Sequence, residues 1–159
     1  MSESSPAEVF AKISEKDEKS GKWMILSLNK KKKAVVDATG DGLESLRKAF
    51  DEGKCSWALF RVHGVDVQEN VTSIRPKLVQ INWVGEKVSA FAKMGALEGK
   101  QKVSKIFKGI ACSFDANGSD DVSADEIVKK LCASGGAHKP VYYDFGCDEK
   151  IQLEFYQKK

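Results

Sequence analysis

The sequence predicts an α/β protein, a mixed β-sheet of about five to six strands with helices on both faces. Two short apolar runs, at residues 55–63 and 78–84, have the length and composition of buried strands. Between residues 103 and 110, apolar side chains recur at the i, i+3, i+4 and i+7 spacing of one helix face. Strand-like runs and helical patterns alternate along the chain, so we expect one layered domain.

The first part of the chain predicts a helix, a β-hairpin, a second helix and a buried strand. Ser5 and Pro6 are a capping residue and a first-turn proline, which together start a helix. Four consecutive lysines lie at the hairpin tip, residues 29–33, which we expect to be a solvated turn. The expected elements are a helix from Pro6 to near Glu18, strands at residues 23–28 and 34–38, a sheet break at 40–42, a helix ending before Gly53 and a strand at 55–63.

The middle of the chain predicts the central part of the sheet. Residues 64–75 are mostly polar and are interpreted as a connection, and the strand at 78–84 follows them as a central strand covered on both faces. Between residues 92 and 108 there are five lysines and one glutamate, in a loose basic segment that leads into the amphipathic helix.

The last part predicts a short strand at residues 111–114 and a helix that Ser123 and Glu126 begin as a capping box. Gly135 and Gly136 are expected to end that helix. Two further stretches, residues 141–145 and 151–156, have strand composition. They would either form a hairpin or add to a sheet edge.

Composition limits the functional classes. With 159 residues, 42% of them hydrophobic and 31% charged, the chain fits one globular domain. The net charge of +3 does not indicate a nucleic-acid partner, and no apolar run is long enough to span a membrane. The N-terminus lacks the pattern of a signal peptide, so we expect a cytoplasmic protein. We also expect a monomer. The widely spaced cysteines are expected to be reduced thiols, with Cys147 the most exposed.

Catalytic motifs are absent: the sequence has neither a phosphate-binding glycine loop nor a nucleophile elbow. His63 and His138 are expected to be structural or solvated, so we predict neither an enzyme nor a cofactor. One alternative is a calcium-binding regulator, because residues 115–126 approach the spacing of an EF-hand loop. The oxygen ligands would come from Asp115, Asn117, Ser119, Ser123 and Glu126, although position six, where glycine allows the sharp turn, is Asp120.

The central strand and its turn carry the pattern K-x-x-x-I-x-W-V-G-E-x-V-S, formed here by Lys77, Ile81, Trp83, Val84, Gly85, Glu86, Val88 and Ser89. A Lys93-Met94 pair and a Gly109-Ile110 pair follow at fixed spacing. This run resembles the actin-depolymerising-factor homology (ADF/cofilin) domain and is most similar to coactosin. The resemblance covers about residues 6–137, which we take as the domain, with residues 138–159 as a C-terminal extension.

The resemblance implies a cytoskeletal protein that binds the sides of actin filaments and regulates filament dynamics, with monomeric actin as a further partner. It implies that the basic segment and the start of the long helix dock in the apolar cleft of actin. The implied actin-binding residues are Lys77, Lys93, Met94, Lys100, Lys102 and Lys105, with Lys77 assigned to filaments. Cofilin-like severing and depolymerisation is the alternative within the family.

Overall fold

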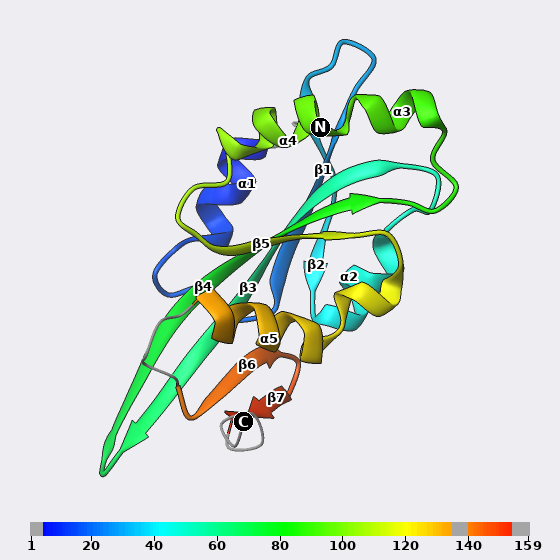
Figure 1. Ribbon diagram of the computed structural model, residues 1–159. Helices are drawn as coiled ribbons and strands as arrows, with labels where there is room; N and C mark the ends of the chain where they lie inside the picture. Colours follow the sequence, from blue (N-terminus) through cyan, green and yellow to red (C-terminus); the bar gives the residue numbers. More distant parts are fainter. Residues whose placement is uncertain (1–4, 135–139, 154–159) are drawn as a thin grey trace.

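A computed structural model describes residues 5–134 and 140–153 of the chain. In this part of the chain, one mixed sheet of seven strands has helices on both faces (Figure 1), which confirms the predicted fold class. The main strands lie in the order β2-β1-β3-β4-β5, and only β4 and β5 are parallel. The elements are α1 (Pro6–Ile13), β1 (Lys22–Leu28), β2 (Ala34–Asp41), α2 (Leu43–Ala49), β3 (Cys55–Gln68), β4 (Val71–Val84), α3 (Ala90–Met94), α4 (Ala96–Ser104), β5 (Ile110–Ala116), the 3₁₀ helix η1 (Ser119–Val122), α5 (Ala124–Ser134), β6 (Tyr142–Gly146) and β7 (Glu149–Gln152).

The first helix begins where the sequence predicts and ends earlier. Ser5 and Glu8 form a complete capping box at the start of α1. The helix ends at Ile13 instead of near Glu18, and the carbonyl oxygens of Ile13 and Glu15 accept hydrogen bonds from the buried side chain of Arg61.

The second strand runs further than predicted. β2 includes Gly40, which was expected to break the sheet. A Cβ atom at Gly40 would lie 2.4 Å from the indole ring of Trp23, so glycine serves here to admit the tryptophan and not to turn the chain. The turn into α2 comes at Gly42, whose φ is +90°.

The interpretation of residues 64–75 as a connection was wrong. They form the far ends of β3 and β4, which pair antiparallel without interruption from Cys55 and Val84 to Gln68 and Val71. The end of this hairpin, residues 63–76, projects from the sheet (Figure 1) and is called the arm below. Residues 67–76 are exposed, so the apolar alternation that marks a buried strand is missing there.

The prediction of an amphipathic helix across residues 103–110 was wrong in its position. Two helices, α3 and α4, occupy the segment expected to be loose, and α4 ends at Ser104. Gly109 then turns the chain with a φ of +68°, and Ile110 begins β5. Val103 and Phe107 are buried as their spacing predicted, although Phe107 lies in the turn that follows the helix.

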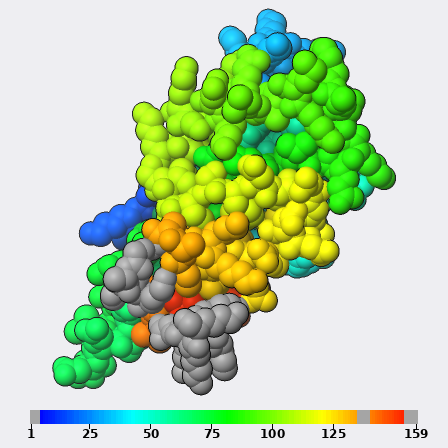
Figure 2. Space-filling model, in the orientation of Figure 1, coloured from blue at the N-terminus to red at the C-terminus, as the bar shows by residue number. Residues whose placement is uncertain are grey.

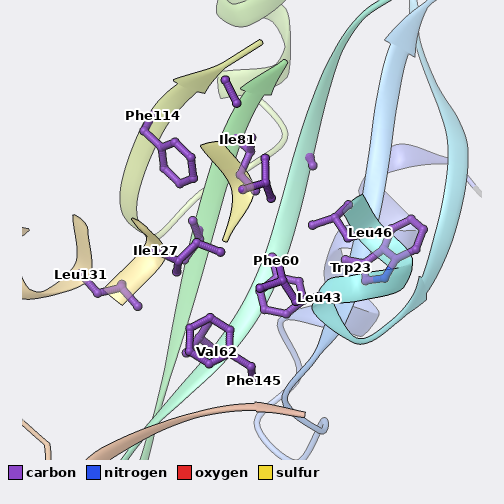
Figure 3. Close-up of a cluster of buried hydrophobic side chains, with 14 of the residues drawn as sticks. Trp23, Leu43, Leu46, Phe60, Val62, Ile81, Phe114, Ile127, Leu131 and Phe145 are labelled. Atoms are coloured by element: carbon purple, nitrogen blue, oxygen red, sulfur yellow. The ribbon is translucent and has the colours of Figure 1, made fainter. Parts of the chain in front are cut away.

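Two apolar cores lie on opposite faces of the sheet, which explains why the sequences of β3 and β4 have the pattern of strands buried on both sides. The core below α2 and α5 contains Leu46, Phe60, Ile81, Ile127 and Phe145 (Figure 3). The core below α1 and α4 contains Ile13, Met24, Trp57, Val103 and Phe107. The prediction of a central strand is confirmed, because β4 lies between β3 and β5 and residues 78–83 are buried.

The C-terminal strands realise both alternatives that the sequence left open. β6 and β7 form an antiparallel hairpin, and β6 also pairs with β3. The predicted helix end at Gly135 and residues 154–156 of the last predicted strand lie outside the described residues. The division into residues 6–137 and 138–159 stays a prediction, although β6 and β7 share the sheet and the core of the preceding residues.

The four cysteines are thiols, and Cys147 is the exposed one, as predicted. Burial raises the pKa of the Cys112 thiol to about 11, which keeps it protonated at neutral pH. Among the helices that the structure describes, none has the length and apolar character needed to cross a membrane.

Candidate functional site

Three large apolar side chains lie exposed on α3 and α4. Phe91, Met94 and Leu97 have exposed fractions of 86%, 81% and 66%. They are three residues apart, and Gly95 joins the two helices with helical dihedral angles, so the three follow one line along successive turns. Exposed apolar side chains that cluster in this way mark an interaction surface. We call these three residues the apolar row.

Lysines border the apolar row. Lys93 lies in α3, Lys100 and Lys102 lie in α4, and Lys105 is the C-cap residue that follows α4. The Lys102 ammonium donates to the backbone carbonyl of Lys32 at 2.5 Å and lies 3.4 Å from the Glu98 carboxylate. The β1–β2 hairpin tip therefore contacts α4 (Figure 2), and the two basic segments form one continuous surface.

Helix α4 is held close to the sheet by Gly99. A Cβ atom at this position would lie 2.2 Å from the ring of Trp57. Trp57 is itself buried in the core below α1 and α4, so the ring has little room to move away. Glycine is therefore what allows α4 to lie so close, and this contact sets the position of the apolar row relative to the sheet.

Lys77 lies apart from the other predicted site residues. It is on β4 at the base of the arm, opposite Val62. It lies seven positions before Val84, which at about 3.3 Å per residue is about 23 Å along the strand. The structure thus brings Lys93, Met94, Lys100, Lys102 and Lys105 together on α3 and α4 and places Lys77 on a second surface.

The arm is that second surface, and it also exposes apolar side chains. Val67, Val71 and Ile74 have exposed fractions of 48%, 64% and 57%. Val71 and Ile74 are three positions apart in β4, so their side chains point to opposite sides of the two-stranded ribbon. Figure 1 shows the arm and α3 at opposite ends of the molecule.

A buried arginine–histidine pair lies where the arm joins the sheet. Arg61 is fully buried, and its guanidinium donates to the carbonyl oxygens of Ile13, Glu15 and Lys16 at 2.6, 2.7 and 3.4 Å. Its Nε donates to Nε2 of His63 at 2.8 Å, so this imidazole nitrogen carries no proton. Burial and the neighbouring Arg61 lower the pKa of His63, and Asp144 opposes them. His63 thus has the structural role that the sequence suggested.

Residues 115–126 do not form an EF-hand loop. The polar side chains make local hydrogen bonds instead: Asn82 Nδ2 to Asp115 Oδ1 (3.1 Å), Asn117 N and Gly118 N to Asp121 Oδ2 (3.0 and 3.3 Å), and Glu126 N to Ser123 Oγ (3.1 Å). Within residues 5–134 and 140–153, no group of three or more His, Cys, Asp or Glu side chains could hold a metal ion. The stretch is a strand-to-helix turn in which Ser123 caps α5.

The comparisons with known proteins agree with this architecture. The family model for the cofilin/tropomyosin-type actin-binding proteins matches residues 2–132. The chain belongs to this family. Coactosin of Entamoeba histolytica is 35% identical over 109 residues, which are 66% of this chain and 70% of that protein. The crystal structure of coactosin from that organism matches with a TM-score of 0.69 at 25% identity, over 84% of this chain and 96% of the other.

Longer proteins also contain the matching region. The drebrin-like protein of Rattus norvegicus is 28% identical over 117 residues, which are 73% of this chain and 26% of that protein. This chain therefore spans about a quarter of that relative's length. The family membership confirms the resemblance seen in the sequence pattern from Lys77 to Ser89.

Sequence reasoning missed Phe91 and Leu97, because it treated their segment as loose. The spacing of Phe91, Met94 and Leu97 could have revealed them, since an interval of three is helical. The contact between Lys102 and the hairpin tip had no local signal, because it joins residues 70 positions apart.

Proposed function

We propose that this protein binds the sides of actin filaments and regulates filament dynamics in the manner of coactosins. The observation that carries the proposal is the apolar row of Phe91, Met94 and Leu97, bordered by lysines, on a member of the cofilin/tropomyosin-type actin-binding family. In this proposal Lys93, Met94, Lys100, Lys102 and Lys105 contact actin from the α3–α4 surface, and Lys77 contacts the filament from the base of the arm.

The apolar row would supply most of the affinity. Fully burying a large apolar side chain contributes about 1.5–3 kcal/mol, whereas an exposed ion pair contributes about 0.2–1 kcal/mol. Met94 suits a contact of this kind, because its side chain is flexible and polarisable. The lysines would mainly raise the rate of encounter with an acidic surface, and their effect would fall as salt rises.

The two remote surfaces support filament binding. A domain whose apolar row and arm lie at opposite ends can touch two neighbouring subunits of a filament at once (Figure 1). A single actin monomer would meet only the α3–α4 surface in this arrangement. The arm and Lys77 would therefore add affinity for the filament through a second linked contact.

We further propose a monomeric binding module of the cytoplasm, associated with the cytoskeleton, and not an enzyme. The side chains that define the α3–α4 surface are alkyl, aromatic and ammonium groups, which bind a partner but supply no nucleophile or general base. No described feature favours calcium binding over this function.

Co-sedimentation with actin filaments tests the proposal. We expect the protein to pellet with filaments at low salt and to pellet less as salt rises. Failure to pellet at low salt would contradict filament binding. Fluorescence microscopy of filament length then separates the two family activities, because rapid fragmentation would indicate cofilin-like severing.

A calorimetric calcium titration tests the remaining alternative. We expect no tight binding, because Asp115 accepts a hydrogen bond from Asn82 and Ser123 caps α5. Tight binding that disappears in Asp115→Ala would favour the calcium-binding regulator.

A further inference from the structure

The first strand of the sheet ends before the arm begins. β1 pairs with β3 only from Leu26 to Trp23, which lies opposite Phe60. Gly21, which precedes β1, makes the last contact of this segment with β3, where its N–H donates to the carbonyl of Arg61 at 2.7 Å. Beyond Arg61, β1 gives β3 no further partner, and the hairpin would continue as a two-stranded ribbon.

The C-terminal strand takes the place that β1 leaves open. β6 pairs antiparallel with β3 through His63–Asp144, Gly64–Tyr143 and Val65–Tyr142, and Val141 N donates to the carbonyl of Val65 at 2.9 Å. β1 and β6 meet end to end at Gly21 and Gly146, whose φ angles are +91° and +84°. A Cβ atom on Gly146 would lie 2.4 Å from the carbonyl oxygen of Ser20, so glycine is what permits this junction.

β6 is firmly anchored. Phe145 is fully buried, with its ring centroid 6.0 Å from that of Phe60, and Figure 3 shows it beside Val62. Tyr143 and Leu153 are buried in the same core as α5. The N–H of Leu153 also donates to the carbonyl of Val141 at 3.0 Å, so the end of β7 holds the start of β6 in place.

The arm has no comparable anchor of its own. Between residues 67 and 72 its two strands pair with each other, no third strand of the described part of the chain joins them, and their side chains are exposed. An isolated two-stranded hairpin is marginally stable in water. The direction of the arm is therefore set at residues 63–65, where a third strand supports it.

We propose that the C-terminal β6–β7 hairpin positions the arm for its contact with the filament. This inference rests on the proposed function, because it assigns the arm to filament binding. Val141, Tyr142 and Tyr143 act as positioning residues in this account: they hold β3 by pairing with it and touch no actin themselves. The C-terminal hairpin would thus tune affinity for filaments and leave affinity for monomers unchanged.

A backbone hydrogen bond can be removed without emptying the core. Val141→Pro eliminates the N–H that donates to Val65, and the half-exposed valine side chain contributes little to packing. Val141→Ala is the matched control, since it shortens the same side chain and keeps the N–H. We expect Val141→Pro to weaken filament binding about fivefold, as the loss of one hydrogen bond predicts, and Val141→Ala to bind normally.

Two further measurements separate positioning from general destabilisation. The affinity of Val141→Pro for monomeric actin should remain within about twofold of the original protein, since α3 and α4 are remote. Hydrogen–deuterium exchange without actin should accelerate in residues 66–73 and stay unchanged in α3 and α4. Equal losses for filament and monomer, or unchanged exchange in the arm, would overturn the proposal.

A second variant decides the matter if Val141→Pro does not fold. A Cβ atom at Gly64 would lie 3.3 Å from Pro140 Cγ and 3.4 Å from Tyr143 Cε1, so Gly64→Val pushes the start of β6 away from β3. It should produce the same selective loss and the same faster exchange, and a normal exchange pattern would count against positioning. If the original protein fails to pellet with filaments, the proposed function is wrong, and the exchange experiment still shows whether β6 orders the arm.

Discussion

The α3–α4 surface and the arm are both exposed and both carry apolar side chains, but they are supported in different ways. Helix α4 rests on the sheet through Gly99 and Trp57, which places the apolar row on a rigid base. The arm extends beyond the sheet as a ribbon, and no third strand among residues 5–134 and 140–153 pairs with its tip. A contact through the first surface should be preorganised, whereas a contact through the second must also order the ribbon.

This difference suggests that the two surfaces contribute differently to binding. Under the proposed function, the preorganised apolar row would supply affinity for any form of actin, and the less ordered arm would supply selectivity for the filament. Changes to the row should then affect monomers and filaments together. Changes to the arm should affect filaments alone, and the predictions below test this contrast in order of expected size.

The largest effect should follow from removing the apolar row. We expect Phe91→Ser combined with Leu97→Ser to weaken binding to both actin forms at least about 30-fold, because central apolar contacts dominate an interface. Their high exposure should keep the change in the free energy of unfolding within about 0.5 kcal/mol. The matched change in the arm, Val71→Ser with Ile74→Ser, should lower filament affinity only. If the apolar-row variant no longer binds filaments but still binds monomers normally, the row does not serve both actin forms and the contrast with the arm is wrong.

The next largest effect should come from the support of α4. Gly99→Ala forces a methyl group into the Trp57 ring, and overpacking of this kind costs about 1–3 kcal/mol, more than the roughly 1 kcal/mol gained in helix propensity. Gly95→Ala is the control, because the nearest atom to its added Cβ lies 3.6 Å away and its φ of −85° is helical. Thermal unfolding should show Gly99→Ala less stable and Gly95→Ala slightly more stable. The idea that Gly99 sets the row fails if Gly99→Ala leaves both stability and actin affinity unchanged.

A smaller effect on the free energy of unfolding should come from His63, at the inner end of the arm, as pH falls. The pKa of His63 is lowered from its ordinary value of 6.5, so below that pH the unfolded chain binds a proton that the folded protein does not. The free energy of unfolding should therefore decrease as pH falls below about 6.5, by at most about 1.4 kcal/mol per pH unit for one proton. The decrease should level off once the lowered pKa of His63 is passed.

His63→Gln supplies the comparison for this pH effect. Its side-chain oxygen can accept the hydrogen bond from Arg61 Nε without titrating, so this variant should lose stability less steeply than the original protein between pH 6.5 and 5. Urea unfolding across this range, with His138→Gln in both backgrounds, measures the difference. Parallel stability curves would show that His63 is not protonated on unfolding.

The two surfaces also differ in how far the sequence could predict them. The strand at residues 78–84 and the lysines after it have local signals, so the family resemblance and five of the six predicted site residues pointed to the α3–α4 surface. The arm has no apolar alternation in its sequence, because its strands are exposed. They pair through backbone N–H and C=O groups, which do not depend on the type of side chain. The buried contact of Arg61 with the end of α1 joins residues 48 positions apart, and a charged residue in an apolar run gives no sign of its partners. The pairing of the arm strands and the partners of Arg61 therefore depend on tertiary contacts, which local composition does not reveal.

The smallest effects should come from the lysines, and they provide the most sensitive test of the two-surface account. Each exposed ion pair contributes about 0.2–1 kcal/mol, so Lys93→Ala with Lys100→Ala should weaken binding to both actin forms more than either change alone. Co-sedimentation at several salt concentrations should show this loss shrinking as salt rises. Lys77→Ala should weaken filament binding alone, since Lys77 lies at the base of the arm.

The hairpin tip provides the control for the lysine variants. Lys31→Ala with Lys32→Ala should have a weaker effect, because Lys102 contacts the backbone carbonyl of Lys32, which these substitutions keep. The tip borders α4, so a small salt-dependent loss for both actin forms is expected from the reduced positive charge. If the tip variant abolishes filament binding while the Lys93 and Lys100 variant retains it, the tip and not α3–α4 is the main contact with actin.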